Sequence, residues 1–222
     1  MTRLNLMAGG PTAQLPADWM AVPGDWVGID RGTLRLIDAG IQPLFCVGDF
    51  DSLTSDEFIR VQSAVPDFKR YPPEKDYTDT QLALKRALTL TPKTTLFLYG
   101  ATGGRLDHAL ANLYLPLTPG LTALTSRLVL IDNQNRVLYL GAGKRVFHPL
   151  TDYRYFGVVS LTPVKGLTIA GAKYPLNDWS STAPFSWASN EFLQEDDISV
   201  QLDAGMVALI YSRDRVGQTQ YN

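Results

Sequence analysis

Hydrophobic and polar positions alternate along the first 120 residues in a pattern that predicts strands separated by helices. Short apolar runs that end at glycine, aspartate or proline are typical of buried strands. We predict such strands at residues 4–7, 26–29, 44–47, 68–71 and 94–99. Apolar side chains recur at helical spacing between and after them, in residues 33–40, 56–65, 80–90 and 106–117. Strands and helices that alternate in this way predict an α/β domain with a mainly parallel sheet.

Local signals refine these helices. Gly40 suits the C-terminal cap of the first helix, Thr54 or Ser55 the N-terminal cap of the second, and Thr78-Asp79 the start of the third. The residues predicted to face inward from the second helix are Phe58, Ile59, Val61 and Val65. The fourth helix carries an apolar stripe of Leu106, Leu110, Leu113 and Leu117.

The pattern changes past residue 125. Seven short β-like runs follow, within residues 126–132, 136–141, 144–149, 154–161, 167–174, 198–202 and 206–212. No long segment of helical period interrupts them, which is typical of an antiparallel sandwich or barrel-like module. We therefore predict an α/β domain over residues 1–124 and an all-β antiparallel sandwich domain over residues 125–222. The junction lacks linker composition, so we expect the two parts to pack together.

Composition and charge exclude several classes of partner. The net charge of −2 gives no basic surface for nucleic acid. The single cysteine, Cys46, has no partner for an internal disulfide and lies in an apolar run, so we predict a buried, inert thiol. The N-terminal residues lack the apolar region of a signal peptide, and no apolar run approaches the ~20 residues of a spanning helix. We expect a cytoplasmic protein without membrane contact.

Three polar clusters share one predicted location. Asp49 and Asp51 follow the strand at 44–47, residues 74–79 lead into a helix, and residues 100–108 connect the strand at 94–99 to its helix. Ligands of open α/β sheets bind at the carboxyl ends of the strands. We therefore expect the three clusters to meet at that edge of the sheet.

The charges in these clusters need compensation. Asp49, Asp51, Asp79 and Asp107 are expected to converge, with Asp76 close behind. Two carboxylates ~5 Å apart repel by roughly 3 kcal/mol at an effective dielectric constant near 20. Protonation relieves this repulsion, and so does a divalent cation. Oxygen ligands without histidine or cysteine favour Mg²⁺, which also takes phosphate oxygens from its substrate.

The glycines indicate what the substrate is. Gly100, Gly103 and Gly104 let the main chain approach a bulky anion and leave free amides at a helix start. Arg105 stands beside them as a candidate phosphate ligand. Next to an acidic cluster that suits Mg²⁺, this turn is typical of a nucleoside triphosphate site.

These motifs identify a resemblance to a known family. Residues 48–52 (GDFDS), 76–79 (DYTD) and 100–108 (GATGGRLDH) resemble the signature segments of thiamine pyrophosphokinases. The resemblance continues, in the family's order, through residues 28–43, 130–137, 160–176 and 189–192. It therefore covers most of the chain.

The resemblance implies an N-terminal nucleotide-binding domain, a C-terminal β-sandwich and a homodimer with active sites at the subunit interface. The implied reaction transfers pyrophosphate from ATP to the hydroxyl of thiamine, in the presence of Mg²⁺, and yields thiamine diphosphate and AMP. The sequence departs from the family's usual Asp-Gly-Gly after the second strand, where it has Asp30-Arg31-Gly32. The role of Arg31, at a phosphate or toward solvent, is left open.

The resemblance also implies roles for particular residues. We predict that Asp49, Asp51, Asp79 and Asp107 are catalytic and that the first three bind Mg²⁺. The residues predicted to bind the nucleotide or thiamine are Asp30, Gly100, Thr102, Gly103, Gly104, Arg105, Trp187, Ser189 and Asn190. Thiamine is a cation with an aromatic ring, so Trp179 or Trp187 is expected to stack on it. His108 is expected to support Asp107.

Two other functions fit part of the pattern. Haloacid-dehalogenase phosphatases also carry Asp-x-Asp after a strand, but they prefer Thr or Val where this chain has Leu53, and their motif follows the first strand. A non-catalytic nucleotide- or thiamine-binding module is the second alternative. Such a module would be expected to lack one of the four aspartates, and all four are present.

Overall fold

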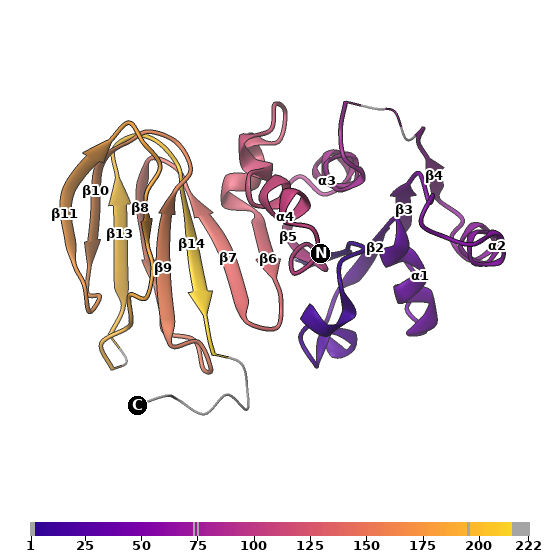
Figure 1. The fold of residues 1–222 in the computed structure, drawn as a ribbon, viewed down its shortest axis with the longest axis horizontal. Helices are drawn as coiled ribbons and strands as arrows, with labels where there is room; N and C mark the ends of the chain where they lie inside the picture. The colour runs from indigo at the N-terminus through magenta and orange to yellow at the C-terminus, as the bar shows by residue number, and fades with distance from the viewer. Residues whose placement is uncertain (1–2, 73, 75, 195, 215–222) are drawn as a thin grey trace. The chain divides into compact units, whose positions relative to one another are not determined.

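A computed structural model describes residues 3–72, 74, 76–194 and 196–214 (Figure 1). Pro73, part of the predicted stop after the fourth strand, and Lys75, part of the second polar cluster, lie outside the described residues. The chain forms two compact units, residues 1–133 and 134–222, and each is described by itself.

The first unit is built on a parallel sheet. Its strands are β1 (Arg3–Met7), β2 (Asp25–Ile29), β3 (Phe45–Gly48), β4 (Phe68–Arg70), β5 (Thr95–Tyr99) and β6 (Leu128–Ile131). They lie in the order β6-β5-β1-β2-β3-β4, and every neighbouring pair is parallel. The predicted α/β fold is therefore confirmed, and the carboxyl ends of these strands share one edge.

Four helices connect these strands: α1 (Arg31–Asp38), α2 (Ser55–Ala64), α3 (Asp79–Leu90) and α4 (Leu106–Leu113). Figure 1 shows α1 and α2 on one side of the sheet and α3 on the other. Right-handed crossovers require this arrangement, because the chain moves outward from β1 to β4 and then returns to β5 on the far side of β1.

The helix ends follow the predicted signals. Thr54 caps α2 in a reciprocal pair with Glu57, and Thr78 caps α3 in the same way with Gln81. The α3 cap makes Asp79 the first residue of that helix. After α1, Gly40 has a φ of +73°, a left-handed conformation that favours glycine.

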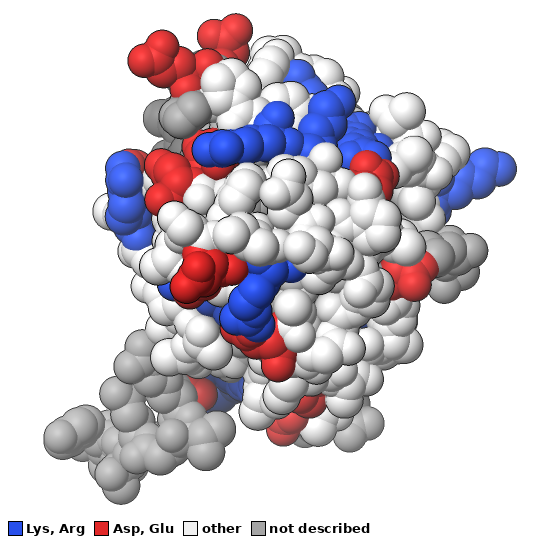
Figure 2. Space-filling model, turned by 90° about the vertical axis from the view of Figure 1, so that its right-hand side faces the viewer, with Lys and Arg blue, Asp and Glu red and all other residues white. Residues whose placement is uncertain are grey.

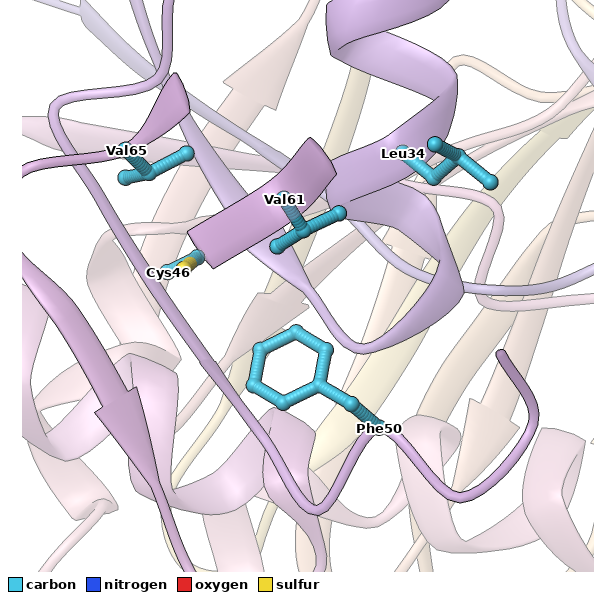
Figure 3. Packing of buried hydrophobic residues seen from close by; sticks show 5 residues of the cluster. All are labelled: Leu34, Cys46, Phe50, Val61 and Val65. Atoms are coloured by element: carbon cyan, nitrogen blue, oxygen red, sulfur yellow. The ribbon is translucent and has the colours of Figure 1, made fainter. Parts of the chain in front are cut away.

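A small hydrophobic cluster lies under the turn that follows β3. It consists of Leu34, Cys46, Phe50, Val61 and Val65 (Figure 3). Phe50 stacks on Phe68 with 4.8 Å between the ring centroids. The cluster fully buries Cys46, and this burial raises the pKa of its thiol to about 12, as expected for an inert cysteine.

Apolar positions on two helices are more exposed than the periodicity indicates. Ile59 is 58% exposed, so the prediction that it faces inward is wrong. Val61 and Val65, one helical turn apart, define the buried side of α2, and Ile59 lies away from it. On α4, Leu106 is 73% exposed and Leu110 is 42% exposed, so the apolar stripe is not covered within this chain.

The second unit is entirely antiparallel. Its strands are β7 (Asn135–Leu140), β8 (Gly143–Phe147), β9 (Tyr155–Ser160), β10 (Val164–Ala170), β11 (Leu176–Ser181), β12 (Ser186–Trp187), β13 (Ile198–Leu202) and β14 (Val207–Ser212). They form the orders β12-β9-β14-β7 and β11-β10-β13-β8. Phe147 of the second set packs on Phe156 of the first, with ring centroids 5.3 Å apart. The predicted all-β sandwich is confirmed.

The charged side chains give no single-sign surface in the view of Figure 2. Lys and Arg side chains lie among Asp and Glu side chains on this face, in keeping with the small net charge. Among the described residues, no helix has both the length and the apolar character that crossing a membrane requires.

We predict that Phe50→Ala destabilises the protein by about 3 kcal/mol, because it empties a packed position between Phe58 and Phe68. Ile59→Ala is the matched control on α2, and its effect should stay within about 0.5 kcal/mol because this side chain is mostly exposed. Urea unfolding of both variants measures the difference. Equal losses of stability would show that Phe50 is not a packing anchor.

Candidate active site

A pocket of about 760 Å³ lies at the carboxyl edge of the parallel sheet. Its walls come from the segments after β1, β2, β3 and β5 and from the start of α3. Of the predicted residues, the pocket brings together Asp30, Asp49, Asp76, Asp79, Gly100, Thr102, Gly104, Arg105 and His108. The meeting of the three polar clusters, expected from the edge rule, is observed.

Three carboxylates form a compact group at this edge. Asp30, Asp49 and Asp51 each offer an oxygen, and these atoms lie within 4.8 Å of one another. Asp49 and Asp51 bracket Phe50, which has a φ of +60° and places its ring in the hydrophobic cluster. The main-chain amide of Asp51 donates to Asp49 Oδ1 over 3.2 Å. The buried ring therefore holds the turn that carries both acids.

Asp30 is the most constrained member of this acidic group. Its φ of +48° is unusual for a residue with a side chain. Its amide donates to the carbonyl of Val47 over 2.9 Å, and Gly48 passes so close that a Cβ there would lie 2.9 Å from the Asp30 Cα. Glycine at position 48 thus lets the ends of β2 and β3 bring the acids together.

The environment of Asp30 disfavours its negative charge. Burial raises the pKa of its carboxyl, the neighbouring Asp49 and Asp79 raise it further, and hydrogen bonds from the Arg31 main chain and Ser52 oppose this. Ser52 Oγ donates to Asp30 Oδ2 over 3.2 Å, whereas Oδ1 is buried without a hydrogen-bond partner. A buried, unpaired carboxylate oxygen beside two other acids fits a bound cation.

Arg31 is exposed, as in one of the two alternatives left open by the sequence, and it also bonds two neighbouring segments. Its Nη1 donates to the carbonyl of Ser52 over 2.6 Å, and its Nη2 lies 3.3 Å from Glu57 Oε1. Arg31 therefore ties the turn after β3 to the first turn of α2.

Two glycine-containing segments line the same pocket as the acids. The amide of Gly10 donates to the carbonyl of Gly100 over 2.8 Å, and that of Ala8 donates to the carbonyl of Tyr99 over 2.9 Å. A Cβ on Gly10 would come within 2.3 Å of the Gly100 oxygen, so only glycine allows this approach. The segment after β1 was not among the predicted site residues. The signal that could have identified this segment is its place directly after a strand of the parallel sheet, at the same edge as the other clusters.

Side chains fix the loop after β5. Thr102 Oγ1 donates to Asp132 Oδ2 over 2.6 Å, and Asn112 Nδ2 donates to the carbonyl of Ala101 over 2.8 Å. Neither Asp132 nor Asn112 was predicted. Both lie outside the three sequence clusters and reach the loop only through the fold.

Asp107 lies outside the group of three carboxylates. It is not among the described residues that line the pocket, and Arg105 pairs with it through Nε at 3.1 Å and Nη2 at 2.5 Å. This pairing holds the pKa of the Asp107 carboxyl below its ordinary value. Within this chain, Asp107 orients Arg105, which does line the pocket.

The residues predicted to bind thiamine lie in the second unit. Trp179 and Trp187 contact edge to face, with centroids 4.5 Å apart, and Phe185 packs 4.8 Å from Trp187. Ser189 is exposed with a φ of +59°. Asn190 is buried, and its side chain bonds the main chain of Tyr174 and Glu191.

In a comparison with known proteins, each of the two parts of the chain matches a family model. Residues 24–126 match the family model "Thiamin pyrophosphokinase, catalytic domain", and residues 145–207 match "Thiamin pyrophosphokinase, vitamin B1 binding domain". The chain is 34% identical over 218 residues to thiamine pyrophosphokinase of Bacillus subtilis, covering 96% of this chain and all of that protein.

Solved structures agree. A thiamin pyrophosphokinase family protein from Enterococcus faecalis is 41% identical, with a TM-score of 0.91 over 96% of this chain and all of that one. The Bacillus subtilis thiamine pyrophosphokinase structure has a TM-score of 0.82 at 34% identity, over 96% of this chain and all of that one. Matches of this extent, in both units, show that the chain belongs to the thiamine pyrophosphokinase family of transferases.

Proposed function

We propose that this protein transfers the terminal pyrophosphate of ATP to the hydroxyl of thiamine and produces thiamine diphosphate and AMP. The observation that carries the proposal is a pocket that brings acidic side chains together with two glycine segments. Such a pocket suits a polyphosphate and its cation. Family membership supplies thiamine as the acceptor.

In the proposed reaction the thiamine hydroxyl oxygen bonds to the β-phosphorus of ATP, and the bond from that phosphorus to the α,β-bridging oxygen breaks. AMP leaves with the bonding electrons. Catalysis of this kind rests mainly on alignment and charge compensation. We assign the acceptance of the hydroxyl proton to Asp79, which lines the pocket at the start of α3 outside the group of three carboxylates.

We propose Mg²⁺ as the cation and Asp30, Asp49 and Asp51 as the residues that hold it. Oxygen-only ligands favour Mg²⁺, and the unpaired Asp30 Oδ1 supports its assignment to the metal. Bound Mg²⁺ would offset phosphate charge and polarise the reacting phosphoryl group. Asp79, which the sequence analysis placed with the ligands, acts in this proposal on the alcohol.

The two parts of the chain have separate tasks in this proposal. Residues 1–124 bind the nucleotide, with Gly100, Thr102, Gly103, Gly104 and Arg105 on its phosphates. Residues 125–222 bind thiamine through Trp187 and Ser189, while the buried Asn190 shapes their segment. We also propose a cytoplasmic homodimer in which thiamine bound by one subunit reaches the acidic pocket of the other.

The product of the reaction tests the proposed activity. With ATP, Mg²⁺ and thiamine, we expect AMP and thiamine diphosphate in equal amounts, and no AMP when thiamine is left out. Chromatography of the nucleotides provides the measurement. Formation of ADP or free phosphate would instead indicate a phosphatase or a monophosphate kinase, and no turnover with ligand binding would indicate a binding module.

Asp30→Asn tests the metal site apart from turnover. Removing a buried charge near two acids should raise the melting temperature in EDTA by about 2–4 °C, the shift that roughly 1 kcal/mol gives a chain of this size. Added Mg²⁺ should raise the melting temperature of the wild type but not of the variant.

Asp178→Asn is the matched control, because exposed Asp178 has a φ of +47° against +48° for Asp30. Any gain from asparagine at a positive φ is therefore common to both variants. A wild-type response to Mg²⁺ in Asp30→Asn would remove Asp30 from the metal site.

The exposed stripe of α4 tests the homodimer. Leu106, Leu110, Tyr114 and Leu117 are all more than a third exposed and follow one another at helical spacing, as expected of a face that a second copy covers. We expect twice the chain mass of 24.5 kDa by light scattering. Leu110→Glu should convert the dimer to monomers, because it buries an unpaired charge.

Leu90→Glu is the control for this experiment, because Leu90 is also an exposed leucine but lies at the end of α3. It should leave the dimer intact. A monomeric wild-type protein, or a dimer that Leu110→Glu does not weaken, would contradict the assignment of this face.

A further inference from the structure

Arg35 on α1 lies behind the wall of the pocket. Its Nη1 donates to the carbonyl of Ala8 over 3.0 Å, and its Nη2 donates to the carbonyl of Gly10 over 2.7 Å. The same Nη1 would lie 3.3 Å from a Cβ on Gly100. One guanidinium therefore stands directly behind both glycine segments.

The charge of Arg35 is not balanced by an acid. Among the described residues, no carboxylate lies within 4.0 Å of its guanidinium, although the side chain is half-buried. Burial lowers the pKa of Arg35, and the neighbouring Arg31 lowers it further. Buried cations are ordinarily paired, so an unpaired one next to a ligand pocket favours an anionic ligand there.

The hydrogen bonds of Arg35 also set the direction of a main-chain donor. No peptide bond is cis in the described chain, so the N–H of Gly9 points away from the Ala8 carbonyl that Arg35 holds. Gly9 lines the pocket, and its amide has no acceptor among the described residues. The arrangement leaves this amide available to a ligand in the pocket.

We propose that Arg35 is a positioning residue for the phosphate chain of the nucleotide. Arg35 fixes the Ala8–Gly10 main chain so that the Gly9 amide bonds a phosphate oxygen. Its positive charge, behind the wall, favours a polyphosphate over an uncharged ligand. This inference rests on the proposed nucleotide-binding function and adds to it the segment after β1 and its support from α1.

The test compares ATP with adenosine, which lacks phosphates, in calorimetric titrations without thiamine. For Arg35→Met we expect about tenfold to hundredfold weaker ATP binding, the effect of losing a charged hydrogen-bonding group. Adenosine affinity should change by less than about twofold, because no phosphate is involved. In turnover, KM for ATP should rise by a similar factor while KM for thiamine stays within about twofold.

Two further variants separate positioning from folding. Arg60→Met is the control, since Arg60 on α2 forms an exposed ion pair with Asp38 and should keep wild-type binding. Arg35→Lys should remain several-fold weaker for ATP, because an ammonium does not reproduce a fork that bonds two carbonyls. This variant also supplies the comparison if Arg35→Met does not fold.

The outcomes are distinct. A purely structural role would lower the fraction of protein that binds, with unchanged dissociation constants in that fraction, and would overturn the proposal. Equal losses for ATP and adenosine, or full recovery of ATP affinity in Arg35→Lys, would overturn it as well. If the wild type binds ATP but transfers no pyrophosphate, the proposed function fails while the nucleotide titrations still decide the role of Arg35.

Discussion

The repulsion among Asp30, Asp49 and Asp51 is the constraint on which the rest of the site depends. One oxygen from each carboxylate lies within 4.8 Å of the others. Oδ1 of Asp30 is buried without a hydrogen-bond partner, and burial raises the pKa of the Asp30 carboxyl. Carboxylates at such separations repel by roughly 3 kcal/mol at an effective dielectric constant near 20. Without a ligand, the surrounding structure must offset this energy.

The anchors of the acidic turn lie outside the pocket. Phe50 lies between Asp49 and Asp51 in the sequence, and its ring packs in the hydrophobic cluster formed with residues of α1, α2 and β3 (Figure 3). Arg31 bonds the carbonyl of Ser52, and the Thr54–Glu57 capping pair fixes the start of α2. The hydrophobic packing and the cap stabilise a backbone that its own charges would otherwise drive apart, as is common where sites store strain.

The location of the site followed from the sequence because it depends on local rules. Strand ends at Asp30, Gly48 and Gly100 were readable from apolar runs that stop at polar or glycine residues, and parallel strands bring such ends to one edge. Thr78 as a cap likewise placed Asp79 at the start of α3. The sequence does not show which of the aspartates lie close enough to share an ion, because this depends on distances between loops.

The positions of Ile59, Asn190 and Arg35 show where sequence reasoning ends. Periodicity finds the apolar residues of a helix but not which one lies at the margin of the buried face, as with Ile59. Asn190 is predicted from the sequence as a binding residue, but no sequence pattern indicates that its side chain bonds the main chain of Tyr174 and Glu191. Arg35 reads as a surface charge on an amphipathic helix.

The role of Arg35 at the pocket follows only from the three-dimensional course of the segment after β1, whose carbonyls it bonds. Its two carbonyl partners are 25 and 27 residues away, and neither carries a side chain that a motif would record. The same path brings Gly10 against Gly100, so the two glycine segments and the arginine lie together at the pocket that Asp30 and Asp49 also line. A pocket with both main-chain amides and carboxylates is complementary to a polyphosphate that carries its own cation, because amides bond the anion while carboxylates bind the cation. The acids and Arg35 are therefore oppositely charged groups around one pocket, and in the proposed function they act on the cation and on the phosphate chain of the same ligand.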